Sequence, residues 1–144
     1  MKFPGVRADN DMYTYGFSFN PWEGPIIGNG AEIRGYINGT ANKFKIKKNI
    51  IFNTQVSALS WKNNTWTTTT DKKNYTSQYV ICCTGSRDRK NPHWPKFKGE
   101  SKYKGKIVHT QAWGDTDFKG KNVTIIGSGC TAITMAPSII KDAK

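Results

Sequence analysis

Two short stretches of this 144-residue sequence place residue types at spacings that suit cofactor chemistry. The first is VTIIGSGCTA, in which an apolar run leads into Gly127-x-Gly129-x-x-Ala132. The first glycine permits a tight bend, the second lets backbone approach a pyrophosphate, and the small third residue lets a helix pack closely. We therefore predict a dinucleotide-binding turn, with a glycine turn that binds no nucleotide as the alternative. Its residues are Gly127, Ser128, Gly129, Cys130, Thr131 and Ala132.

The second stretch, YKGKIVHTQAW, contains His109 four residues before a tryptophan. Histidine titrates near neutral pH, so His109 is a candidate general base. No serine or cysteine nucleophile and no second carboxylate accompanies it at a spacing that would indicate catalysis. Cys82 and Cys83 are adjacent and are interpreted as small apolar residues. We therefore predict that His109 fixes a loop through its ring nitrogens, and a catalytic role is the alternative.

Hydrophobic periodicity predicts the elements that would hold these stretches in place. Apolar side chains at helical spacing predict a helix over 31–44, although Gly35 and Gly39 weaken it. Runs rich in β-branched and aromatic residues predict three strands, and DKKN at 71–74 predicts the hairpin turn between the last two. Those strands are expected at 49–61, 64–70 and 75–83.

The second half of the chain is expected to contain a loop, two strands and a helix. Two prolines predict a loop over 86–99, followed by a short strand at 106–109, a stronger one at 122–126 and a helix from Cys130. The sequence ICCTGS ends the strand at 75–83, so Thr84 and Gly85 are expected to turn the chain sharply.

Composition limits the classes of function. The formal net charge is +12, and the lysines are scattered, which predicts solvated faces; attraction of an anionic cofactor and binding of nucleic acid are alternatives. Three cysteines form neither a disulfide framework nor a metal pair, so no metal is expected. No apolar run approaches the roughly 20 residues of a membrane span, and the N-terminus lacks a signal peptide's apolar core. We therefore expect a cytoplasmic protein without a membrane span.

The stretch YKGKIVHTQAW resembles the fingerprint of Baeyer–Villiger monooxygenases: an aromatic residue, then x-Gly-x-x-x-His-x-x-x-Trp. The tryptophan favours this branch over the related flavin-containing monooxygenases that oxygenate nitrogen and sulfur. Gly114 follows it, where the family usually has proline or aspartate. The fingerprint residues are Tyr103, Gly105, His109 and Trp113.

Three further stretches resemble the same family in the family's order, and they imply FAD and NADPH as cofactors. KFPGVRADNDMYTYGFSF resembles the segment after the first FAD motif, FNTQVSALSW its strand pair, and ICCTGS its Ala-Thr-Gly strand end with Cys83 in place of alanine. GSGCTA resembles the NADPH turn. The resemblance implies that Asp9 orients an active-site arginine, and a carboxylate suits a guanidinium; a turn-capping aspartate is the alternative. The implied cofactor contacts are Arg7 with NADPH, Tyr15 with flavin, and Val56, Thr84 and Gly85 with FAD.

The resemblance implies an α/β fold: part of an FAD-binding Rossmann-like domain and the first strand–turn–helix of an inserted NADPH-binding Rossmann domain. We expect a partial FAD domain over 1–100, a linker with the fingerprint over 101–119 and the start of the NADPH domain over 120–144. The family's first GxGxxG unit is not found in the sequence. We therefore expect an interior fragment that is inactive alone, with the remainder of the enzyme as a partner.

The implied reaction inserts one oxygen atom of O2 into a small-molecule ketone. Oxygenation of a nitrogen or sulfur heteroatom is one alternative function. The other is a basic protein that binds nucleic acid, or an inert remnant. The substrate is not encoded in these residues, and the residue that distinguishes NAD from NADP would follow the turn by about 20 positions.

Overall fold

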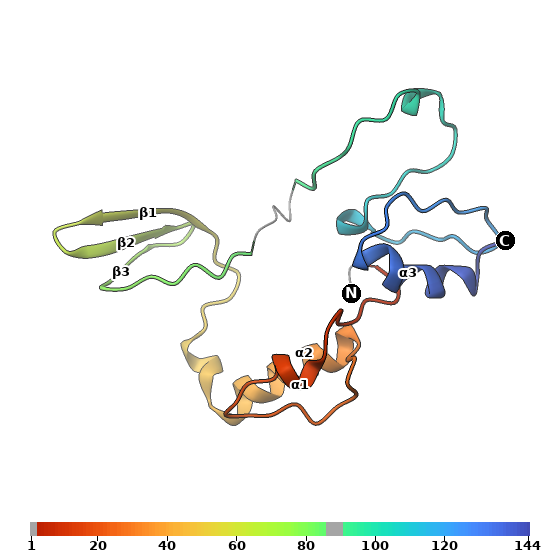
Figure 1. Ribbon diagram of the computed structural model, residues 1–144. Coiled ribbons are helices and arrows are strands. Elements are labelled where there is room, and N and C mark those ends of the chain that lie inside the picture. Colours follow the sequence, from red (N-terminus) through yellow and green to blue (C-terminus); the bar gives the residue numbers. More distant parts are fainter. Residues whose placement is uncertain (1–2, 86–90) are drawn as a thin grey trace. The chain divides into compact units, whose positions relative to one another are not determined.

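The computed structural model describes residues 3–85 and 91–144, which belong to two compact units (Figure 1). The first unit combines Met1–Lys43 with Arg87–Lys144, and the second comprises Phe44–Ser86. Part of the predicted loop, residues 86–90, lies outside the described residues.

The second unit is an antiparallel sheet of three strands in the order β1-β2-β3, preceded by a 3₁₀ turn, η1 (Ile46–Asn49). The strands are β1 (Val56–Lys62), β2 (Thr65–Thr70) and β3 (Asn74–Ser77). Asn63 and Asn64 connect the first two with φ of +50° and +56°, the left-handed pair that two-residue hairpins favour. Trp61 pairs with Trp66 across the strands, with ring centroids 5.3 Å apart.

The structure confirms the strand at 64–70 and the turn at 71–74, and it shortens the other two predicted strands. The predicted strands at 106–109 and 122–126 are wrong for the described residues, in which these segments have no strand assignment. A strand requires a hydrogen-bonded neighbour. Hairpin partners lie a few residues away, whereas parallel neighbours must come from a crossover connection. The local meander therefore forms, and the two apolar runs have no paired neighbour within the described ranges.

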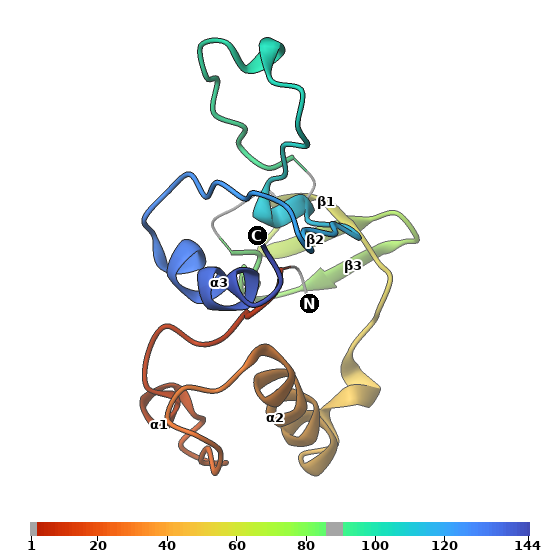
Figure 2. The ribbon, with the colours of Figure 1, turned by 90° about the vertical axis from the view of Figure 1, so that its right-hand side faces the viewer.

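The first unit contains the helices. They are α1 (Met12–Tyr15), α2 (Gly30–Lys43) and α3 (Cys130–Ile140), with 3₁₀ turns η2 (Glu100–Lys102) and η3 (Thr110–Ala112) (Figure 2). The predicted helices at 31–44 and from Cys130 are confirmed. A capping box begins α2: Asn29 Oδ1 accepts from the Glu32 amide at 3.0 Å, and Glu32 Oε2 accepts from the Asn29 amide at 2.7 Å.

Few apolar side chains of this unit are buried. They are Met12, Trp22, Met135 and Ile139. Trp22 lies against two glycines, and a Cβ at Gly24 or Gly28 would come within 2.5 Å or 2.9 Å of its Cζ2. The Trp22 indole N–H donates to the Pro25 carbonyl at 2.8 Å. The Trp22 ring therefore fixes the chain segment that connects α1 to α2.

Candidate functional site

A cleft of about 350 Å³ opens beside α1 and α2 in the first unit. The segment before α1 forms one wall, because Ala8 N donates to Gly28 O at 2.8 Å and Gly30 N donates to Val6 O at 2.9 Å. Apolar and aromatic side chains make up most of the lining, with two polar residues at positions 9 and 10. The lining residues are Ala8, Asp9, Asn10, Met12, Tyr15, Phe17, Ile33, Tyr36 and Ile37.

Tyr36 holds the other wall together, a role that the sequence did not indicate. Its hydroxyl accepts from the Phe17 amide at 2.7 Å and donates to the Asn20 carbonyl at 2.5 Å. Its ring stacks on Phe17 at 5.6 Å and meets Trp22 edge-on at 5.2 Å. Tyr36 lies within the predicted helix at 31–44, but nothing in a periodicity pattern shows where a hydroxyl will find partners.

Two of the predicted site residues in the N-terminal segment come together at this cleft. Asp9 and Tyr15 both line it, and the Tyr15 hydroxyl accepts from Asn10 Nδ2 at 3.2 Å. Arg7 is exposed and forms an antiparallel bridge with Asn29, but it does not line the cleft. The acidic side chain of Asp9 is exposed and therefore accessible to a cationic partner.

The predicted dinucleotide turn leads directly into α3. Gly127 has φ of +125°, a conformation that only glycine adopts without strain. Gly129 is the N-cap of α3 with φ of −74° and ψ of 174°, and no side chain caps the helix there. A Cβ at Gly127 or Gly129 would meet no atom within 4 Å, so the space in front of this backbone is open. Ser128 and Cys130 are exposed, and Thr131 and Ala132 are half-buried.

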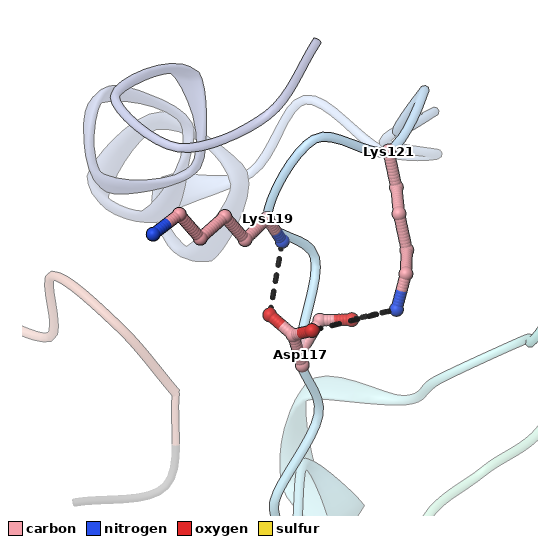
Figure 3. A network of polar contacts seen from close by, with 3 residues as sticks. All are labelled: Asp117, Lys119 and Lys121. Atoms are coloured by element: carbon pink, nitrogen blue, oxygen red, sulfur yellow. Dashed lines mark hydrogen bonds and ion pairs between the residues drawn. The ribbon is translucent and has the colours of Figure 1, made fainter.

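A polar loop before the turn is tied to the end of α3. Asp117 Oδ1 accepts from the Lys119 amide at 3.0 Å, and Lys121 Nζ lies 3.6 Å from Asp117 Oδ2 (Figure 3). The hydrogen bond from the Lys119 amide lowers the pKa of Asp117 below its ordinary value of 3.8, and the Lys121 charge acts in the same direction. Gly120 N donates to Asp142 O at 2.7 Å, which fixes the entry to the 122–126 segment against the helix end.

The fingerprint residues lie in a bend of the first unit around η3. The Tyr103 ring folds over Gly105, where a Cβ would come within 2.5 Å of Tyr103 Cζ, so a side chain there would have to displace this exposed ring. His109 caps η3, because its Nδ1 accepts from the Gln111 amide at 3.2 Å. Trp113 is half-buried and contacts the Phe118 ring edge-on at 6.2 Å.

Trp94 and Glu100 support His109, and the sequence pattern missed both. The Trp94 ring lies 5.7 Å from the His109 ring at an angle of 42°, and its Nε1 donates to Glu100 Oε1 at 3.1 Å. The only signal in the sequence was a large aromatic residue between two prolines in a loop otherwise interpreted as irregular.

The remaining predicted cofactor residues belong to the second unit. Val56 begins β1 and is 47% exposed. Thr84 is exposed, and Gly85 has φ of +77° with open space where a Cβ would be, but neither residue is assigned a turn, so the sharp turn expected there stays a prediction. The structure therefore brings Asp9 and Tyr15 together in one cleft, while Val56, Thr84 and Gly85 lie in the other unit.

Within residues 3–85 and 91–144, no three histidine, cysteine or acidic side chains are grouped closely enough to hold a metal ion. Over the same residues, no helix combines the length and apolar character needed to cross a membrane.

Comparison with known proteins gives one consistent family. A family model described as pyridine nucleotide-disulphide oxidoreductase matches residues 24–144. The chain is 37% identical to MymA of Mycobacterium tuberculosis over 148 residues and 37% identical to the FAD-containing monooxygenase EthA of Mycolicibacterium smegmatis over 147 residues. Each alignment covers 96% of this chain and 30% of the relative, so the chain spans about 30% of the length of these relatives.

Solved structures agree with these relatives. An oxidized steroid monooxygenase bound to NADP matches with a TM-score of 0.79 and 28% identity, covering 99% of this chain and 29% of that one. OTEMO in complex with FAD and NADP matches with a TM-score of 0.78 and 30% identity, with the same coverage of 99% and 29%. The mixed helix and strand structure thus corresponds to part of the FAD-binding Rossmann region of such monooxygenases. On the match over residues 24–144, the chain belongs to the pyridine nucleotide-disulphide oxidoreductase family.

Proposed function

We propose that this chain supplies cofactor-binding parts of a Baeyer–Villiger-type monooxygenase, which uses FAD and NADPH to insert one oxygen atom of O2 into a ketone. The observation that carries the proposal is the open glycine turn at the start of α3, in a chain similar along 96% of its length to an FAD-containing monooxygenase. The similar steroid monooxygenase structure contains NADP, and the similar OTEMO structure contains FAD and NADP, which supports both cofactors. The substrate class rests on the fingerprint residues.

The turn at 127–132 fits the pyrophosphate of NADPH. The backbone conformation at position 127 requires glycine. Gly129 has an ordinary φ, so the lack of a side chain there leaves space open and is not needed for the backbone conformation. The first amide groups of a helix have no intrahelical partner, and their dipoles favour an anion. Because no side chain caps α3, the amides of Cys130 and Thr131 can serve a ligand, whereas the Ala132 amide donates to the Gly129 carbonyl at 3.0 Å. Ser128, Cys130, Thr131 and Ala132 would complete the contact.

The cleft beside α2 fits the flavin part of FAD. Its aromatic lining suits a flat ring, and Tyr15 would contact that ring. When bound, FAD and NADPH would supply hydride transfer and the activation of O2. Asp9 would orient an arginine guanidinium at the cleft, because a carboxylate forms strong paired hydrogen bonds with that group. Arg7 would face NADPH.

The second unit and the fingerprint would complete the arrangement. Val56 at the start of β1, and Thr84 and Gly85 in the segment after β3, would contact FAD. The fingerprint would act as a hinge between an FAD domain over 1–100 and an NADPH domain beginning at 120, with His109 as a loop anchor. The cap that His109 provides to η3 supports an anchoring role.

Calorimetric titration of NADP+ into the full chain tests the proposal, with Gly129→Val as the decisive variant. A Cβ added at this position meets no protein atom within 4 Å, so we expect the fold to be unchanged while the valine side chain blocks the pyrophosphate, and affinity should fall at least tenfold. Gly35→Val on α2 is the matched control, because a Cβ there also meets nothing within 4 Å. Equal affinities for wild type and Gly129→Val, or no binding of NADP+ to the wild-type chain, would contradict the proposal.

A further inference from the structure

The chain around Gly5 crosses α3 at very close range. Gly5 has φ of +73°, and a Cβ there would lie 2.5 Å from both the Thr134 carbonyl oxygen and Ser138 Oγ. The serine hydroxyl can rotate away, but the Thr134 carbonyl is helix backbone and cannot. Conformation and space therefore both require glycine at this position.

The contact point on α3 is tied to the dinucleotide turn. The Thr134 hydroxyl donates to the Cys130 carbonyl at 2.9 Å and lies 3.1 Å from the Thr131 carbonyl, so it connects the contact to the first turn of the helix. Thr134 is also buried, together with Met135 and Ile139. Motion of the helix start relative to Thr134 is therefore restricted.

On its other side, Gly5 leads into the wall of the cleft. Val6 and Ala8 are hydrogen bonded to residues 28–30 at the start of α2, and Asp9 follows directly. Asp9 lies four positions after Gly5 in the chain, a span of at most about 14 Å when fully extended. Neither end of this short segment can shift without affecting the other.

We propose that Gly5 is a positioning residue that couples α3, and with it the turn at 127–132, to the Asp9 wall of the cleft. A displacement of α3 is transmitted through the Gly5 contact to residues 6–9. The consequence for catalysis rests on the proposed function, in which the two ends of this connection serve NADPH and the flavin. The mechanical coupling does not rest on it, because the contacts belong to the protein alone.

NMR of the isotope-labelled full chain tests the coupling. A nuclear Overhauser effect between Gly5 Hα and Ser138 Hβ is expected in the wild type. Gly5→Ala should shift the amide signals of Cys130 and Asp9 together. Gly99→Ala is the matched control, because Gly99 has φ of +85° with nothing within 4 Å of a Cβ, so it adds strain without a contact. It should leave both signals unchanged.

A second variant approaches the contact from the helix and avoids strain at Gly5. Ser138→Val enlarges the half-buried side chain opposite Gly5, and we expect it to shift the Asp9 amide. Ile133→Val on the same helix is its control, because Ile133 is 63% exposed. Absence of the Overhauser effect in the wild type, or shifts from Ser138→Val that stop at residue 7, would overturn the coupling.

Titration with NADP+ separates the coupling from the proposed function. In the wild type, signals of Gly129 and Asp9 should shift together, and in Gly5→Ala the Asp9 response should be lost. If Gly129 responds in the wild type and Asp9 does not, the coupling is wrong. If Gly129 does not respond, the proposed NADPH site is wrong, and the coupling is then decided by the variants alone.

Discussion

Removing the N-cap of α2 should loosen the wall of the cleft by an amount that follows from its hydrogen bonds. In Asn29→Ala, the acceptor for the Ala31 and Glu32 amides, at 2.9 and 3.0 Å, is lost. Loss of an N-cap costs about 0.5–2 kcal/mol. Both amides lose their partner, so we expect the upper half of that range, about 1–2 kcal/mol. The bond from the Asn29 amide to Glu32 Oε2 involves backbone and persists.

The assay is native-state amide hydrogen exchange along α2. A loss of about 1–2 kcal/mol corresponds to a 5–30-fold increase in the population of the opened helix. Exchange at Tyr36 and Thr40 should therefore accelerate about 5–30-fold, while the amides of β1 and β2 in the second unit keep their rates. Asn29→Asp replaces the amide oxygen by a carboxylate oxygen that can still accept both hydrogen bonds, and it should leave the rates within a factor of about three.

Asn38→Ala is the matched control, because Asn38 is exposed in the interior of the same helix. Alanine has the higher helix propensity, so this change should slow exchange slightly. Unchanged exchange in Asn29→Ala, or acceleration of equal size in Asn38→Ala, would refute the reasoning. The cleft wall would then owe its order to the aromatic packing of Tyr36 alone.

Three further predictions concern other parts of the chain. The pKa of Asp117 lies below 3.8 in the folded protein, so the ionised Asp117 stabilises the loop fully above pH 3.8, and this stabilisation is lost as the pH falls through the lowered pKa. Carbon NMR of the Asp117 carboxyl during acid titration should show this midpoint. Asp117→Asn should remove the pH dependence of the Lys119 amide signal. Asn64→Gly should stabilise the β1–β2 hairpin by up to about 1 kcal/mol, since glycine carries no cost at positive φ, and slower exchange of the hairpin amides would show it. Tyr36→Phe should destabilise the first unit by about 1–3 kcal/mol in urea unfolding, because the Phe17 amide loses its acceptor.

The elements predicted correctly from sequence are those whose hydrogen bonds close locally. The helix ending at Lys43 and the one starting at Cys130 satisfy their backbone within a few residues, and the DKKN turn connects neighbouring strands. The segments at 106–109 and 122–126 have the composition of strands, but composition does not supply a partner. Pairing depends on distant chain segments, and a local pattern contains no information about them.

The parts of the candidate site likewise differ in whether their residues are close together in the sequence. The glycine turn was found because its geometry is a property of six consecutive residues, and the positive φ of Gly127 agrees with the role expected of that residue. The contacts of Tyr36 with Phe17 and Trp22 and the contact of Trp94 with His109 join residues 14 or more positions apart, so no local spacing indicates them. The binding roles of Asp9 and Tyr15 came from resemblance, and they remain proposals.

Three glycines of the first unit illustrate why residue type alone does not reveal a role. Gly127 is required by its backbone angle, and Gly129 has an ordinary angle with empty space before it. Gly5 combines a positive φ with a blocked Cβ position. A side chain at Gly127 therefore strains the fold, one at Gly129 enters open space that the proposed function assigns to NADPH, and one at Gly5 pushes on a neighbouring helix. Because these effects differ in kind, a variant at each position reports separately on folding, on binding and on the connection between the turn and the cleft.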